Sequence, residues 1–233
     1  MWQYSQIIDR ILQNRKRKYK KALIHMLTTE LYLQDPCRAS SIPLWKAREI
    51  TVPDHMKILH DARFDPGLLQ HYTDEPYFRL LHDMRQLKPP VLPQGFHFCQ
   101  ISAEELARHI RSCYHDLSIT AEGLAAYTAH PVHDPDLWVA VCNDHTGEIA
   151  ASGIAQLDRT IGEGILEWIQ VSPDCRRMGF GSAVVCELLR RMIGKADFVT
   201  VSGKCHNPTH PEALYRACGF TGQDTWHILT KKP

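Results

Sequence analysis

Apolar and polar positions alternate in two different ways along residues 95–233, and this predicts strands mixed with helices. Strand-like runs lie at residues 95–101, 136–144, 149–157, 163–171, 198–204 and 224–231. Helix-like runs lie at residues 102–114, 120–129, 181–194 and 210–220. The first helix opens with Ser102 and Glu105, which have the spacing of a capping box. This mixture predicts an α/β fold with helices packed on the faces of one sheet.

In the first 90 residues, the spacing of apolar residues predicts helices and no strands. Apolar residues recur at helical intervals over residues 3–33, and further helices are predicted over residues 54–64 and 73–87. The sequence KPPVLP at residues 88–93 then interrupts the pattern, because proline lacks a backbone donor and has a fixed φ. We therefore expect a helical N-terminal region over residues 1–90 and a second domain over residues 91–233.

Charge is unevenly distributed along the chain. The formal net charge is +1, but residues 1–50 hold ten Lys/Arg against four Asp/Glu, so this segment carries +6 and the remainder −5. The run RKRKYKK at residues 15–21 could face RNA, an acidic partner or a membrane surface. Its single aromatic residue, Tyr19, argues against nucleic-acid recognition by stacking. A cover over an acceptor pocket, or a homodimer contact, is the use that we expect of this region.

The eight cysteines are scattered and include no CxxC pair. This predicts reduced thiols and a cytoplasmic location. The fourteen histidines form no HExxH motif, so no metal site is expected. No apolar stretch approaches the length of a membrane span, and the charged start of the chain does not have the apolar centre of a secretory signal.

The stretch CRRMGFGSA, residues 175–183, lies between a predicted strand and a predicted helix. Glycine permits a tight path, the start of a helix presents free backbone N–H groups, and arginine suits phosphate oxygens. A phosphate-binding loop is thus one interpretation, and a tight turn with solvated arginines is the other. The stretch matches neither a P-loop nor the dinucleotide fingerprint.

The stretch that includes residues 171–181 and a second stretch at residues 213–220 together resemble two motifs of the GCN5-related N-acetyltransferase (GNAT) family. Val171, Pro173, Arg176, Gly179 and Gly181 follow the family's acetyl-CoA signature, R/Q-x-x-G-x-G/A after an apolar strand. The segment ALYRACGF, residues 213–220, is similar to the family's second landmark, a helix ending in Leu-Tyr-x-x-x-Gly-Phe. Both occur in the expected order, and the resemblance covers roughly residues 95–233.

The resemblance implies a mixed, mostly antiparallel GNAT-type sheet flanked by helices, with acetyl-CoA as co-substrate. It places the pantetheine arm on the strand end and the pyrophosphate on the loop, with a further pantetheine contact from Asn207. In this chain, Asn207 is separated from Tyr215 by an insertion containing Pro208 and Pro211. The implied coenzyme-binding residues are Ile169, Gln170, Val171, Arg176, Arg177, Met178, Gly179, Phe180, Gly181, Ser182 and Asn207.

Amine acetylation requires a neutral amine, so a base must take the proton of an ammonium group. Glu167 lies on the strand ILEWIQV, where simple alternation puts it on the same face as Ile165, Ile169 and Val171. Apolar surroundings would raise the pKa of this carboxyl. Glu163 is the nearby alternative, and a structural ion pair is another explanation for Glu167. By resemblance, Tyr215 gives a proton to the departing CoA thiolate.

We therefore expect an N-acetyltransferase that transfers an acetyl group to the primary amine of a small molecule or peptide. No cysteine lies in a motif with a histidine base, which favours direct attack in a ternary complex. Two alternatives stay open. One is a non-catalytic acyl-CoA sensor, and the other is an RNA-directed acetyltransferase that uses the basic N-terminal helices.

Overall fold

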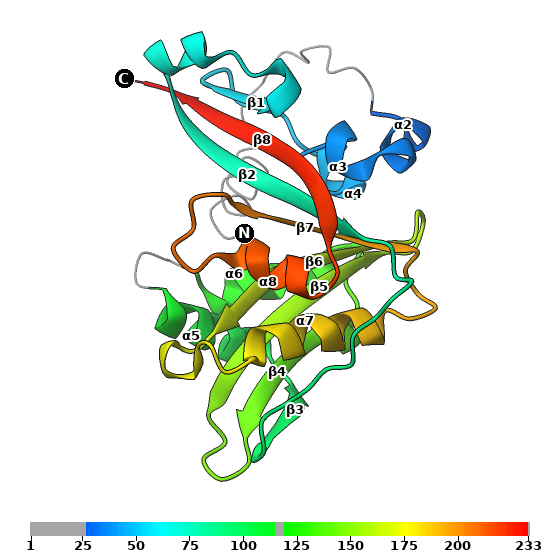
Figure 1. Cartoon of the computed structure of the whole chain (residues 1–233), viewed down its shortest axis with the longest axis vertical. Coiled ribbons are helices and arrows are strands. Elements are labelled where there is room, and N and C mark those ends of the chain that lie inside the picture. The colour runs from blue at the N-terminus through cyan, green and yellow to red at the C-terminus, as the bar shows by residue number, and fades with distance from the viewer. Residues whose placement is uncertain (1–26, 115–118, 233) are drawn as a thin grey trace. The chain divides into compact units, whose positions relative to one another are not determined.

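The computed structural model describes residues 27–114 and 119–232. The chain divides into two compact units (Figure 1). The first unit contains the described residues up to Leu81, together with Thr200–Ala213 and the segment from Thr221 onward. The second unit contains His82–Val199 and Leu214–Phe220. Each unit thus combines chain segments that are distant in sequence.

The first unit is built on strands in the order β1-β8-β2-β7. The long strand β8 pairs antiparallel with both β1 and β2. Short helices precede and separate these strands. The bounds are α2 Thr29–Gln34, α3 Pro36–Ala39, α4 Leu44–Ala47, β1 Met56–His60, η1 Asp61–Arg63, η2 Pro66–Gln70, β2 Tyr72–His82, β7 Phe198–Lys204 and β8 Thr221–Lys231.

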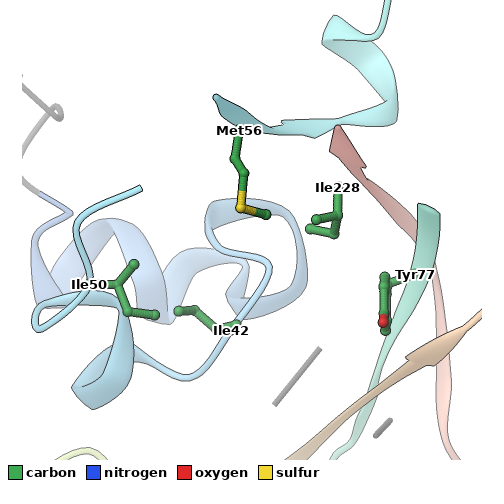
Figure 2. Packing of buried hydrophobic residues seen from close by; sticks show 5 residues of the cluster. All are labelled: Ile42, Ile50, Met56, Tyr77 and Ile228. Atoms are coloured by element: carbon green, nitrogen blue, oxygen red, sulfur yellow. The ribbon is translucent and has the colours of Figure 1, made fainter. Parts of the chain in front are cut away.

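An apolar cluster joins the helical segment of the first unit to its strands (Figure 2). Ile42 and Ile50 flank α4, whereas Met56, Tyr77 and Ile228 come from β1, β2 and β8. All five side chains are buried. Their burial removes apolar surface from water and so stabilises the packing of α2–α4 on these strands.

The second unit is built on strands in the order β6-β5-β4-β3, and each neighbouring pair is antiparallel. Nearly every residue of β5 is buried, as expected of a strand that is covered on both faces. The bounds are β3 Phe96–Gln100, α5 Ala103–Cys113, α6 Ala121–Ala125, η3 Ala126–Ala129, η4 Pro135–Leu137, β4 Trp138–Asn143, β5 Ile149–Asp158, β6 Glu163–Val171, η5 Pro173–Cys175 and α7 Phe180–Arg191. The helix α8, Pro211–Ala217, enters this unit at Leu214.

Helices α5 and α7 cover opposite faces of this sheet. Ser152 on β5 bonds His109 of α5. The next residue, Gly153, lies against Val184 of α7. Because successive strand residues point to opposite faces, α5 and α7 lie on the two sides. Figure 1 shows α7 running across the strands of this unit.

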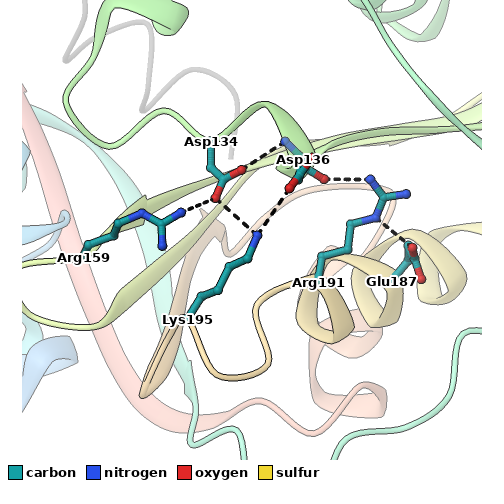
Figure 3. Close-up of polar contacts among 6 residues, drawn as sticks. All are labelled: Asp134, Asp136, Arg159, Glu187, Arg191 and Lys195. Carbon is teal, nitrogen blue, oxygen red and sulfur yellow. Dashed lines mark hydrogen bonds and ion pairs between the residues drawn. The ribbon is translucent and has the colours of Figure 1, made fainter.

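A polar network holds the C-terminal end of α7 (Figure 3). The buried carboxylate of Asp134 accepts a 2.7 Å hydrogen bond from Arg159 and lies 3.5 Å from the ammonium of Lys195. Arg191, in the last turn of α7, donates to the backbone carbonyl of Asp136 at 2.7 Å. These charge-assisted contacts connect α7 to the β5–β6 hairpin and to η4, so that the helix is fixed at the end opposite its Gly-rich start.

The predicted strands and helices after residue 94 are confirmed, including the capping box of Ser102 and Glu105. The mostly antiparallel sheet flanked by helices is also confirmed. The predicted domain boundary after residue 90 stays a prediction. Most of the predicted helix over residues 3–33, and the run RKRKYKK, lie outside the described residues, and α2 begins only at Thr29.

The helices predicted over residues 54–64 and 73–87 are wrong, because β1 and β2 are strands there. In β2 the four consecutive residues Tyr77, Phe78, Arg79 and Leu80 are all buried. A strand that is covered on both faces shows no apolar–polar alternation. The spacing of its apolar residues was therefore also compatible with one face of a helix. Pairing with β8, a strand from the far end of the chain, provides its backbone hydrogen bonds.

The prediction that all cysteines are reduced is wrong for one pair, because Cys99 and Cys142 form a disulfide between β3 and β4. Cys142 pairs with His97 in the register, which brings it diagonally beside Cys99. The two residues are 43 positions apart in sequence, so no local spacing indicated the bond. The cytoplasmic location stays a prediction.

The described residues contain no helix that is both long and apolar enough to span a bilayer. Over the same part of the chain, no three His, Cys, Asp or Glu side chains are grouped so as to hold a metal ion.

Candidate active site

The connection between β6 and α7 has the backbone form of an anion-binding loop. After the short turn η5, Arg177 and Gly179 adopt left-handed backbone conformations, with φ of 67° and 89°. Residues with a left-handed backbone conformation in a loop point successive backbone N–H groups toward one side. The residues from Arg176 to Gly179 are exposed, so these groups are accessible.

The start of α7 adds further donors. The first intrahelical hydrogen bond runs from the N–H of Ala183 to the carbonyl of Gly179 at 3.0 Å. The N–H groups of Phe180, Gly181 and Ser182 precede it and have no acceptor within the helix. Among the described residues, no side chain caps this terminus. Free N–H groups and the positive end of the helix dipole favour an anion here.

The two glycines of the loop are required for different reasons. Gly179 has a positive φ, and a Cβ atom on it would project into open space in front of the loop. Gly181 packs closely instead, because a Cβ atom there would lie 3.1 Å from Leu214 Cδ2 and 3.5 Å from Val171 Cγ2. The first glycine therefore shapes the loop, and the second brings α7 against the end of β6 and the middle of α8.

The side chains of the loop divide between solvent and core. Arg177 and Met178 are exposed, and Arg176 donates to the backbone carbonyl of Cys113, at the end of α5, at 3.3 Å. Phe180 is buried edge-to-face against Phe96, with ring centroids 4.7 Å apart. Phe180 thus anchors the helix, and its backbone alone faces the loop.

Strand β6 contains a β-bulge just before the loop. Ser152 pairs with Gln170 and Ile154 pairs with Glu167, so two residues of β6 lie opposite Gly153 alone. One of them, Trp168, has a φ of 54°, which is uncommon for a large side chain. A bulge re-aims the residues that follow it and commonly occurs at functional sites.

The bulge changes which face each side chain occupies. Residues paired across strands share a face, so Glu167 lies with Ile154 and Ser152 on the α5 face. Ile169 faces α7, because a Cβ atom on Gly153 would meet its Cδ1 atom. The expectation that Glu167 shares a face with Ile169 and Val171 is therefore wrong, because the extra residue inverts the alternation beyond Trp168.

The candidate bases are both buried. Glu163 is fully inaccessible, and 7% of Glu167 is exposed. The register places Glu163 opposite Asp158, and the alternation before the bulge puts Glu163, Ile165 and Glu167 on one face. Two carboxyl groups therefore lie on one face of β6, and their catalytic role stays a prediction.

Tyr215 lies on α8 directly after Leu214, the residue that contacts Gly181, so its helix adjoins the loop. Its ring is buried and packs edge-to-face against Phe220 at 5.7 Å. Burial raises the pKa of Tyr215 well above its usual value, and nearby Tyr114 and Cys218 add to this effect. The phenol therefore stays protonated at neutral pH, as a proton donor requires.

Asn207 lies in the first unit. Its Oδ1 atom accepts hydrogen bonds from the N–H and the hydroxyl of Thr209, at 2.9 and 2.8 Å. This pattern is an Asx turn, which accounts for the residue by local geometry. A contact with the pantetheine arm stays a prediction.

A family model described as an acetyltransferase (GNAT) domain matches residues 133–222. The match includes the loop, its two glycines and Tyr215. The chain contains a GNAT acetyltransferase domain. This domain belongs to the acyltransferase class of enzymes, and the predicted family and fold are confirmed. No curated protein matches the chain.

Solved structures share the fold at low sequence identity. A GCN5-related N-acetyltransferase from Sphaerobacter thermophilus aligns over 81% of this chain with a TM-score of 0.61 and 17% identity. A Drosophila protein aligns over 82% with a TM-score of 0.57 and 19% identity. The chain spans 66% of the length of each. A GNAT-family acetyltransferase from Colwellia psychrerythraea aligns over 93% of this chain and 76% of its own, with a TM-score of 0.54 and 14% identity.

Sequence reasoning missed two parts of the site. Trp168 gave no signal, because a left-handed conformation is expected of glycine or asparagine and not of tryptophan. No sequence pattern predicted the polar contacts of His109 with Ser152 and Ser172 either, since these three residues come from separate parts of the chain.

Proposed function

We propose that the chain is an N-acetyltransferase that uses acetyl-CoA to acetylate the primary amine of a small molecule or peptide within a ternary complex. The observation that carries the proposal is the loop between β6 and α7, with its left-handed Arg177 and Gly179 and its uncapped helix start. A diphosphate fits this cradle, because backbone N–H groups and two arginines supply donors without a competing carboxylate at the helix start.

Acetyl-CoA, when bound, supplies an acetyl thioester activated for transfer. The N–H groups of Gly179 to Ser182, with Arg176 and Arg177, would hold its diphosphate. The end of β6, from Ile169 to Val171, would lie along the pantetheine arm. A backbone amide of this strand end would donate a hydrogen bond to the thioester oxygen and stabilise the charge that develops on it.

The proton steps are assigned to side chains of the second unit. Glu167 takes a proton from the acceptor ammonium, directly or through a water molecule, and Glu163 is the alternative base. Tyr215 donates its phenolic proton to the departing thiolate sulfur, which suits a group that burial keeps protonated. The nitrogen loses its second proton as the tetrahedral intermediate collapses to the amide, and this proton replaces the one that Tyr215 gave to the sulfur. The proton on the carboxylate passes to solvent, so an ammonium group and acetyl-CoA give the amide, the CoA thiol and one free proton.

Calorimetry with CoA and acetyl-CoA, followed by an amine panel, tests the proposal. The panel contains metabolite amines, amino acids, peptides with free N-termini and lysine peptides. CoA release is measured by chromatography, because the partly exposed thiols of Cys175 and Cys205 would also react with a thiol reagent. We expect saturable binding and CoA release with at least one amine. Binding without release from any amine would indicate a sensor, and absence of binding would remove the coenzyme site.

A further inference from the structure

A buried histidine of α5 connects strand β5 to the start of the loop that follows β6. His109 is 5% exposed. Its Nδ1 atom lies 2.7 Å from Ser152 Oγ on β5, and its Nε2 atom lies 2.9 Å from Ser172 Oγ at the start of the loop. Both ring nitrogens are therefore engaged by hydroxyl groups from outside the helix.

The hydrogen bonds run in one direction. Ser172 donates its single hydroxyl proton to the carbonyl of Ile149 at 2.7 Å, so it must accept from His109 Nε2–H. The neutral imidazole then carries a lone pair on Nδ1, which accepts from Ser152. Ser152 in turn accepts from the amide of Gln170. The complete relay is Gln170 to Ser152 to His109 to Ser172 to the carbonyl of Ile149.

The relay requires the neutral form of the ring. Burial lowers the pKa of His109 to about 4. Protonation would place a second N–H on Nδ1, facing Ser152, which already receives a donor from Gln170. Ser152 would then accept twice and have to direct its own proton elsewhere, so the order of donors and acceptors would be lost.

Helix α5 also holds the far side of the same turn. Arg176 donates to the carbonyl of Cys113, one helical turn after His109, at 3.3 Å. The Sγ atom of Cys113 itself lies 3.5 Å from His109 Nε2. Residues 172 and 176 flank η5, so a single helix attaches both ends of this turn. The path of the chain from β6 into the loop thus depends on α5.

We propose that His109 is a positioning residue that sets the geometry of the β6 end and of the phosphate loop for the coenzyme. The proposal rests on the proposed function, in which this loop binds the diphosphate of acetyl-CoA. His109 does not contact the reacting atoms in this assignment. It acts through Gln170, whose backbone lies between Ile169 and Val171, and through Ser172, the first residue after β6.

The test compares His109→Leu, His109→Gln and Ser172→Ala with wild type. His109→Leu removes both hydrogen bonds of the ring and should raise the dissociation constant and the KM for acetyl-CoA about tenfold, with kcat within about threefold. His109→Gln keeps a donor near the Nε2 position and should recover most of this affinity. His145→Gln, in the exposed turn after β4, is the matched control and should leave both constants unchanged.

Ser172→Ala covers the case in which His109→Leu fails to fold, because it removes the acceptor of the relay and leaves the histidine in place. We expect the same rise in the dissociation constant. A lower melting temperature with an unchanged dissociation constant and KM, in the folded variants, would show a packing role only and overturn the proposal.

A nitrogen NMR spectrum of the wild-type imidazole separates this proposal from the proposed function. It should show a neutral His109 protonated at Nε2 down to about pH 5. An Nδ1–H tautomer, or titration near pH 6.5, would overturn the relay even if acetyl-CoA binds. If acetyl-CoA does not bind at all while the spectrum is as expected, the proposed function fails and the relay is a feature of the fold alone, so the positioning role fails with it.

Discussion

Gly153 of β5 lies directly against the side chain of Ile169, beside the bulge of β6. A Cβ atom on Gly153 would lie 2.5 Å from Ile169 Cδ1 and 2.8 Å from Val184 Cγ1, both closer than van der Waals contact. We expect Gly153→Ala to lower the free energy of unfolding by about 1–3 kcal/mol, because the bulge or α7 must move. Urea denaturation measures this change.

Gly123→Ala in α6 is the control for Gly153, since the nearest atom to its Cβ would be Thr120 Oγ1 at 3.4 Å. This variant should be as stable as wild type or more stable, because alanine reduces the freedom of the unfolded chain. Equal stability of both variants would show that β5 and β6 are not closely packed at the bulge.

Gly179→Glu should abolish acetyl-CoA binding in calorimetry. The new side chain would enter the open space in front of the loop, bring a negative charge to the diphosphate site and strain a backbone with φ of 89°. Gly194→Glu is a matched control, because Gly194 also has a positive φ and open surroundings but follows the opposite end of α7. Unchanged affinity in Gly179→Glu would place the coenzyme elsewhere.

Tyr215→Phe should lower kcat about a hundredfold, with the dissociation constant of acetyl-CoA within about twofold of wild type. The substitution removes only the hydroxyl group, and the ring can still pack against Phe220. Tyr77→Phe, at a buried tyrosine of the first unit, controls for loss of a buried hydroxyl. Wild-type turnover in Tyr215→Phe would assign this tyrosine to packing.

Glu167→Gln should lower kcat about a hundredfold at neutral pH if this carboxylate is the base. The loss should diminish as pH rises, because the acceptor amine then loses its proton in solution without help. Glu163→Gln, on the same face of β6, is the matched comparison. A loss in Glu163→Gln alone would transfer the role to that residue, and wild-type rates in both would leave the base outside β6.

The fifth prediction concerns acid stability. The pKa of His109 is lowered to about 4 by burial, whereas an unfolded histidine titrates near 6.5. Below about pH 6.5 the unfolded chain therefore binds a proton that the folded protein does not, so stability falls as the pH is lowered and this loss is complete near pH 4. The total amounts to roughly 3 kcal/mol.

Urea denaturation of wild type and His109→Gln between pH 7 and pH 4 measures this contribution. Wild type should lose stability more steeply than the variant over this interval, since other titrating groups affect both proteins alike. Identical slopes would show that His109 is already protonated, or accessible to water, in the folded protein.

Local features of the sequence were sufficient to predict much of the candidate site. The loop with Gly179 and Gly181 lies between a strand and a helix as expected, and Tyr215 follows on the last helix. Such features depend on neighbouring residues only. Three of them can be predicted without knowing any distant contact: the φ preference of glycine, the free N–H groups at the start of a helix, and the capping box of Ser102.

The tertiary structure decided the remaining features, because each depends on residues that are far apart in the chain. Strands β1 and β2 exist because β8 pairs with both, although their own side-chain pattern indicated helices. The disulfide of Cys99 and Cys142 follows from strand register. An extra residue opposite Gly153 puts Ile169 and Val171 on the face opposite Glu167, since one inserted residue inverts a period of two. The local pattern of a segment indicates which secondary structure its own residues favour. Only the packing of the whole chain determines which distant segments become its neighbours.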